Sequence, residues 1–171
     1  MIDDIVRTAS SLAAKKIGAI IVLERETKLS DSIESGVPID ATLSKRLLES
    51  IFNPGSPLHD GAVIVQRGRV AAASCFLPLS LNPDVGEEFG TRHRAAIGLT
   101  EETDALVVVV SEETGSISLV RAGTMSQALD ATALRRLLGK LLEPRPRRQG
   151  SMEPTPRKAA VPSAAPQPDK P

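Results

Sequence analysis

The run of four valines from Val107 to Val110 restricts the fold of this chain more than any other feature. Valine is branched at Cβ, which favours an extended backbone over a helix. A strand that is apolar on both faces has to be covered on both sides, as in the sheets of α/β proteins. Segment 104–111 therefore predicts a central strand of a sheet, with helices packed against it.

Other short apolar runs alternate with helical patterns along the chain. Strands are predicted at 17–23, 37–41, 61–66, 69–79 and 116–120, with Arg67-Gly68 as a hairpin turn. Helices are predicted at 2–16, at 30–35, from a cap at Thr42 to Ile51, from Thr91 to just before Gly98, and at 126–142. This order predicts a single α/β domain, 1–143, with a mixed central β-sheet flanked by helices on both sides.

The composition changes after Glu143. Eight of the 13 prolines lie in segment 144–171, together with six Lys or Arg residues and two Asp or Glu residues. The segment contains almost no large apolar residues that could form a core. This Pro/Ala/Arg-rich segment is therefore predicted to be a disordered tail. The whole chain has 21 basic and 21 acidic residues, which leaves the domain before the tail mildly acidic. Any anion site must therefore be local.

The cysteine content and the length of the apolar runs bear on the cellular location of the protein. The single cysteine, Cys75, excludes an internal disulfide and a cysteine cluster for zinc. No run of about 18 apolar residues is present, so no membrane span is predicted, and no secretory signal is visible. The expected location is the cytoplasm.

The motif Leu58-His59-Asp60-Gly61-Ala62 precedes a predicted strand. A carboxylate beside glycine can hold Mg²⁺ or Mn²⁺, because glycine lets a ligand approach the backbone closely. An imidazole next to it would suit Mn²⁺ better than Mg²⁺. On sequence alone, Asp-Gly can equally be a plain turn, and His59 a loop histidine that faces water.

The motif Gly90-Thr91-Arg92-His93-Arg94 stands at a predicted helix start. Free amides, a hydroxyl and guanidinium groups at such a start attract phosphate. Arg92 and Arg94 cannot point the same way on a helix, so one of them is expected to hold phosphate and the other to have a structural or dimer-facing role. A solvated basic helix face is the alternative.

Two further segments could complete a nucleotide site. Ser111-Glu112-Glu113 follows the valine strand, at the edge where α/β sheets usually place ligands, although it also fits an ordinary charged hairpin. Phe76 could stack on adenine, with the backbone of Leu77 reading the edge of the base. An aromatic residue in a strand, however, usually belongs to the core.

These motifs, in this order, resemble those of the diadenylate cyclases, which condense two ATP molecules into cyclic di-AMP. The resemblance covers about residues 17–121 and is strongest to the membrane-anchored branch, whose transmembrane helices precede the domain. It implies a mixed sheet wrapped by helices, with Asp60 and Arg92 as catalytic residues and Asp60 and His59 as metal ligands. The implied nucleotide-binding residues are Gly61, Ala62, Phe76, Leu77, Gly90, Thr91, Arg92, His93, Arg94, Ser111, Glu112 and Glu113.

The resemblance also implies the cofactor and partners. Mg²⁺ or Mn²⁺ is expected as the metal, with Co²⁺ as a third candidate, and ATP as the substrate. A twofold product implies a homodimer, or a higher homo-oligomer, with two sites face to face. Nucleic acid is not an expected partner, since the DNA-binding helices of the DNA-scanning branch are missing. Phe76 departs from the tyrosine that many relatives carry.

Two other functions remain open on sequence alone. An inactive module that binds ATP or cyclic di-AMP as a sensor would keep the arginines but would not need Asp60. A metal-dependent phosphohydrolase would need more clustered carboxylates and histidines than this chain has, with its two histidines. An ordinary P-loop ATPase is not expected, because the chain has no G-x-x-x-x-G-K-[ST] motif.

Overall fold

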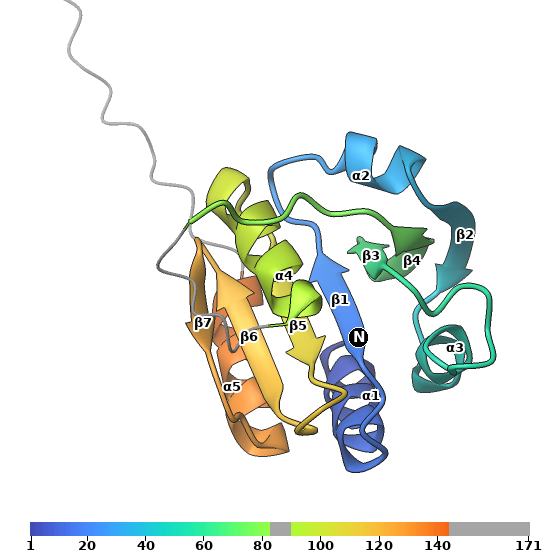
Figure 1. Cartoon of the computed structure of the whole chain (residues 1–171), viewed down its shortest axis with the longest axis vertical. Helices are drawn as coiled ribbons and strands as arrows, with labels where there is room; N and C mark the ends of the chain where they lie inside the picture. The colour runs from blue at the N-terminus through green and yellow to red at the C-terminus, as the bar shows by residue number, and fades with distance from the viewer. Residues whose placement is uncertain (83–89, 144–171) are drawn as a thin grey trace, which may run out of the picture.

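A seven-stranded mixed sheet forms the centre of the fold, as the valine run predicts (Figure 1). The computed structural model describes residues 1–82 and 90–143; the predicted tail and most of the predicted 82–84 loop lie outside them. The strands are β1 (Ala19–Leu23), β2 (Val37–Thr42), β3 (Ala62–Gln66), β4 (Arg69–Cys75), β5 (Leu106–Val110), β6 (Ile117–Arg121) and β7 (Thr124–Ser126). Their order across the sheet is β2-β4-β3-β1-β5-β6-β7.

The register brings one end of several strands to a single edge of the sheet. β1 runs parallel to β3, with Ile21 opposite Val63, and antiparallel to β5, with Ile21 opposite Val108. The remaining pairs are antiparallel. The starts of β1, β3 and β6 and the ends of β4 and β5 therefore lie along one edge, and the candidate site residues follow this edge.

Helices cover both faces of the sheet, as expected. α1 (Ile2–Ala14), α3 (Lys45–Ile51) and α5 (Ala131–Leu142) contribute to one apolar core, while α2 (Ser30–Glu34) and α4 (Thr91–Glu102) pack on the other. The valine strand serves both cores, because Val108 and Val110 belong to the first and Val107 and Val109 to the second. None of the helices in the described ranges, 1–82 and 90–143, combines the length and apolar character of a membrane span.

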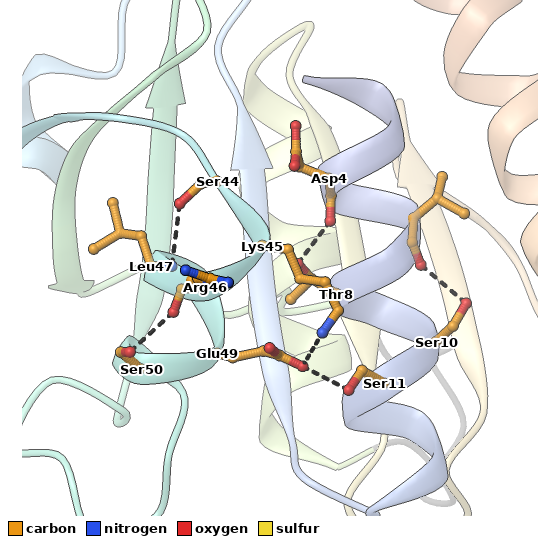
Figure 2. Close-up of polar contacts among 11 residues, drawn as sticks. Asp4, Thr8, Ser10, Ser11, Ser44, Lys45, Arg46, Leu47, Glu49 and Ser50 are labelled. Atoms are coloured by element: carbon orange, nitrogen blue, oxygen red, sulfur yellow. Dashed lines mark hydrogen bonds and ion pairs between the residues drawn. The ribbon is translucent and has the colours of Figure 1, made fainter.

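Polar contacts join α1 to α3 (Figure 2). Glu49 of α3 accepts a hydrogen bond from the Ser11 hydroxyl of α1 at 2.6 Å and pairs with Lys45 at 2.7 Å. The N-cap of α3 is Ser44, whose hydroxyl accepts from the Leu47 N–H at 3.3 Å. The predicted cap, Thr42, is instead the last residue of β2, so that prediction is wrong.

Three other predicted boundaries are also wrong. The fourth strand ends at Cys75 rather than at residue 79, because the chain turns at Ser74 (φ 54°) and the Phe76 N–H bonds to the Ser35 hydroxyl outside the sheet. α5 begins after its cap, Asp130, because segment 124–126 forms the short edge strand β7, which the sequence analysis missed. α4 continues through Gly98 to Glu102.

A buried carboxylate anchors the loop that follows β1. Glu24 has a side chain only 4% exposed, and it accepts hydrogen bonds from Gln66 Nε2 at 2.7 Å, the Leu29 N–H at 3.0 Å and Lys28 Nζ at 3.1 Å. Burial alone would raise the pKa of Glu24, but these bonds and the Lys28 charge outweigh it and lower the pKa below its ordinary value.

We therefore expect Glu24→Ala to lower the free energy of unfolding by about 1–3 kcal/mol in urea titrations at pH 7. Glu34→Ala, which removes an exposed glutamate of α2, is the control and should have little effect. Because the folded-state pKa is depressed, the stabilisation is present above the ordinary value of 4.5 and is lost as pH falls through the lower folded value. A difference between wild type and Glu24→Gln that grew on acidification would contradict this account.

Candidate active site

Two adjoining hollows open where the start of α4 meets the strand ends. The first, which we call the β4 hollow, has a volume of about 430 Å³ and is lined by Ile20, Asp60, Gly61, Ser74, Cys75, Phe76, Leu77, Leu79, Thr91, Arg92, Ala95 and Glu112. The second, the β6 hollow, has a volume of about 510 Å³ and is lined by Gly90, Thr91, Arg92, His93, Ser111, Glu112, Glu113, Thr114, Ser116, Ser118 and Gln127. Thr91, Arg92 and Glu112 line both, so they form the ridge between the hollows.

The β4 hollow brings Asp60 and Phe76 together. Asp60 is exposed and leads into β3 through Gly61, whose φ of +98° and contact with the backbone of Ser74 and Cys75 leave no room for a side chain. Phe76 follows the end of β4, and this residue is 76% exposed. Phe76 is therefore not a core residue, so the ordinary explanation for an aromatic in this segment does not hold.

The ridge is built around Arg92. Its Nη1 lies 2.9 Å from Glu112 Oε1, and its side chain is only 23% exposed, against 56% for Glu112. The guanidinium also lies against Gly18, just before β1, where an added Cβ would be 2.6 Å from Arg92 Cζ. The partly buried guanidinium is thus fixed from two sides at the mouth of both hollows.

The β6 hollow is lined mainly by hydroxyl groups and the first residues of α4. The N-cap of α4 is Gly90, and no side chain in the described part of the chain caps this helix. Burial, above all, lowers the pKa of His93; the Arg92 charge lowers it further, while Glu113 acts in the opposite direction. The hydroxyls, the Arg92 guanidinium and the start of α4 could all contact phosphate oxygens in this hollow.

Most of the sequence-predicted residues line these hollows, but three line neither. Ala62 is buried in the core at the start of β3, and Arg94 contributes its backbone oxygen to the Ser80 N–H at 3.0 Å. His59 contacts the Ser56 carbonyl oxygen through Nδ1 at 2.7 Å, which leaves Nε2 as its other ring nitrogen. Arg92 thus lines both hollows, whereas Arg94 lines neither.

The sequence analysis missed several residues of this region, above all Ser118 and Gln127, which line the β6 hollow, and Gly18, which lies against Arg92. Ser118 carried a weak signal, because a hydroxyl interrupts the otherwise apolar segment Ile117 to Val120. Gly18 and Gln127 carried none, since their position depends on packing between distant segments.

The donor set fits a metal ion that arrives with a phosphate ligand. No group of three or more His, Cys, Asp or Glu side chains within residues 1–82 and 90–143 could hold a metal by itself. Mg²⁺, however, is commonly bound by one or two carboxylates together with waters and substrate phosphates. Asp60 could supply one carboxylate oxygen, and His59 Nε2 lies on the neighbouring residue.

Gly18→Ala should weaken ligand binding without unfolding the protein, because the added Cβ would occupy space that the Arg92 guanidinium needs. The Cβ of Gly18→Ala would displace a flexible guanidinium rather than backbone, so we expect little loss of stability in thermal unfolding. Affinity for ATP, the ligand that the sequence motifs predict, should fall by about tenfold, which corresponds to one hydrogen bond to a charged group. Gly139→Ala, where a Cβ meets nothing within 4 Å, is the control and should leave affinity unchanged. Unaltered affinity in Gly18→Ala would contradict the assigned role of this contact.

Comparison with known proteins identifies the class of this fold and site. Residues 6–125 match the family model described as DisA bacterial checkpoint controller nucleotide-binding. This match covers well over half of the chain, and the chain therefore belongs to that family.

Similar proteins include a cyclic di-AMP synthase and other diadenylate cyclases. The chain is 46% identical over 137 residues to cyclic di-AMP synthase CdaA of Bacillus subtilis, covering 80% of this chain and 50% of that protein. It is 52% identical over 114 residues to diadenylate cyclase CdaS of Bacillus thuringiensis, covering 67% and 57%. The crystal structure of a double mutant of DacA from Staphylococcus aureus matches with a TM-score of 0.79 and 43% identity, over 81% of this chain and 93% of that one. The chain spans about half the length of the curated relatives it matches.

Proposed function

We propose that this chain is the catalytic domain of a diadenylate cyclase that condenses two ATP molecules into cyclic di-AMP and two diphosphates. The observation that carries the proposal is the pair of hollows that meet at Thr91 and Arg92. One hollow offers an aromatic face and a carboxylate, and the other offers hydroxyls and a helix start. The two hollows and the ridge between them could hold, in this order, the base, the α-phosphate and the β- and γ-phosphates of one ATP molecule. The similar proteins named cyclic di-AMP synthase and diadenylate cyclase support the same activity.

The adenine would lie in the β4 hollow. Phe76 presents an exposed ring on which a base can stack, and the backbone of Leu77 is placed beside it to read the base edge. The α-phosphate would then lie on the ridge, where Thr91 offers a hydroxyl and Arg92 a guanidinium. The β- and γ-phosphates would extend into the β6 hollow, towards Ser111 and His93. When ATP binds, the Arg92 guanidinium would contact phosphate oxygens and give up part of its ion pair with Glu112.

The reaction joins two nucleotides on two copies of the chain. The 3′-hydroxyl oxygen of one ATP forms a bond to the α-phosphorus of the other, the bond from that phosphorus to the bridging oxygen breaks, and diphosphate leaves in line. Arg92 and Thr91 would stabilise the charge that develops on the α-phosphate oxygens. Asp60 would hold the incoming hydroxyl and favour loss of its proton. A divalent metal, held by Asp60 and phosphate oxygens with His59 nearby, would supply further charge neutralisation when bound.

A single copy cannot complete this chemistry. Each domain offers one pair of hollows, whereas the product contains two nucleotides related by twofold symmetry. We therefore propose a homodimer with the two sites face to face, the arrangement in which the same surface of each subunit is used. Specific activity should then rise with protein concentration until dimers predominate.

Product analysis tests the proposal. Purified protein is incubated with ATP and either Mg²⁺ or Mn²⁺ at several protein concentrations, and the products are separated by chromatography and weighed by mass spectrometry. Cyclic di-AMP, formed with specific activity that rises with concentration, is the expected result. ATP or cyclic di-AMP binding without product would instead indicate a sensor module, and ADP or AMP alone would indicate a hydrolase.

A further inference from the structure

Ser118 is a buried hydroxyl in a part of the sheet that is otherwise apolar. It lies on β6 opposite Val109 of β5 and is 1% exposed. Its neighbours Ile117, Leu119 and Val120 all belong to the apolar cores. An alanine or valine would fit this environment at lower cost, so the hydroxyl needs an explanation.

The Ser118 hydroxyl has no partner inside the described part of the protein. No hydrogen bond joins it to a side chain or backbone group among residues 1–82 and 90–143. Every fully buried side-chain nitrogen or oxygen in those residues has a partner, so the Ser118 hydroxyl is not fully enclosed. Ser118 lines the β6 hollow, so its hydroxyl opens onto that space. Its partner is therefore expected to be something that enters the hollow.

The groups around Ser118 indicate an anionic partner. Arg92, His93 and the start of α4 form one wall of the hollow, and the Gln127 side chain stands on another. An uncapped helix start and a guanidinium both attract phosphate oxygens. Thr114 and Ser116 also line the hollow, but their hydroxyls are 2.8 Å apart and bond to each other. Ser118 is thus, besides Ser111, a strand-side hydroxyl of this hollow that is left for a ligand.

Two carboxylates also line the β6 hollow and limit what it can hold. Glu112 pairs with Arg92 at 2.9 Å, and Glu113 is exposed. A ligand with the concentrated charge of a terminal phosphate must therefore lie away from them. The buried position of Ser118 on the sheet offers such a place.

We propose that Ser118 is a specificity-determining residue that donates a hydrogen bond to the terminal phosphate of the nucleoside triphosphate. This inference rests on the proposed function, because it takes the base to lie in the β4 hollow and the α-phosphate on the ridge. From that starting point the γ-phosphate is the group that extends farthest into the β6 hollow. A diphosphate is one group shorter and leaves the hydroxyl unpaired. Ser118 therefore makes the site prefer triphosphates to diphosphates.

Binding of nucleotides that cannot cyclise tests this proposal. The dissociation constants of 3′-deoxy-ATP and 3′-deoxy-ADP are measured by calorimetry, in the presence of Mg²⁺, for wild type, Ser118→Ala and Ser116→Ala. We expect wild type to prefer the triphosphate and Ser118→Ala to lose about tenfold of that preference, the effect of one hydrogen bond to a charged group. Ser116→Ala, which removes a hydroxyl that is already paired within the same hollow, should keep the wild-type ratio.

Thermal unfolding of the same variants separates a ligand role from a structural one. Without nucleotide, Ser118→Ala should be about as stable as wild type, because the hydroxyl that it removes makes no hydrogen bond within the described part of the protein. A marked loss of stability would mean that the hydroxyl is satisfied within the protein, and the proposal would be overturned. An unchanged preference in Ser118→Ala would overturn it as well, while leaving the cyclase proposal intact. If wild type binds neither nucleotide, both proposals fail.

Discussion

Replacing Asp60 by asparagine should abolish cyclic di-AMP formation while leaving ATP binding largely intact. Asparagine keeps the shape of the side chain but loses the charge that would hold the metal and favour ionisation of the attacking hydroxyl. Removal of such a group typically costs about 10²–10⁴-fold in rate. Asp60 lies in the β4 hollow, apart from the hydroxyl groups of the β6 hollow, so the contacts proposed for the β- and γ-phosphates remain.

The measurement compares initial rates of product formation and ATP dissociation constants for Asp60→Asn and wild type. Asp31→Asn is a suitable control, because it removes an exposed carboxylate of α2 outside both hollows. Chelation of divalent metal with EDTA should reduce the wild-type rate to the level of Asp60→Asn, and EDTA should have little further effect on the variant. Full activity in Asp60→Asn would show that this carboxylate does not take part.

Gly98→Ala should destabilise the protein, although alanine normally stabilises the interior of a helix by about 0.5–1 kcal/mol relative to glycine. Gly98 lies within α4, and a Cβ there would clash with the Pro78 carbonyl oxygen and stand 2.6 Å from Ser80 N. These are backbone atoms of a segment tied to the helix, since the Ser80 N–H donates to the Arg94 carbonyl oxygen at 3.0 Å. Such overpacking typically costs about 1–3 kcal/mol.

Urea unfolding of Gly98→Ala and Gly139→Ala makes a direct comparison, because both glycines lie inside helices. Gly139→Ala meets no atom within 4 Å and should be as stable as wild type or more so. Gly98→Ala should also weaken ATP binding, since the displaced segment carries Leu79, which lines the β4 hollow. Equal stabilisation by both substitutions would contradict the close passage of segment 78–80 over α4.

Gly98 is an example of a position at which the fold was predicted wrongly from the sequence. The valine run and the Arg67-Gly68 hairpin were predicted correctly, because burial and turn geometry are local properties that these residues carry. Glycine in a helical segment was interpreted as a helix end, but here it makes room for another segment. β7 was missed because a strand of three residues, Thr124–Ser126, becomes regular only by pairing with β6.

In the candidate site, too, some residues were predicted from the sequence and others were not. The two motifs around Asp60 and Arg92 indicated that these residues would act together, and the structure places both on the β4 hollow. The exposure of Phe76 could not be predicted, since it depends on where the chain leaves β4. Gly18 and Ser118 owe their positions to strands paired across the sheet. The charged and polar residues of the two motifs were thus recognisable from sequence as candidates, whereas Gly18 carried no signal and Ser118 only a weak one.

The most direct test of the central claim uses an equal mixture of unlabelled and ¹⁵N-labelled ATP. Wild-type protein is incubated with this mixture and divalent metal, and the cyclic product is weighed by mass spectrometry. If two ATP molecules are condensed, the half-labelled cyclic di-AMP should be about twice as abundant as either uniformly labelled form. A labelled product that contains only one nucleotide, or no cyclic dinucleotide at all, would contradict the assignment of this chain as a diadenylate cyclase.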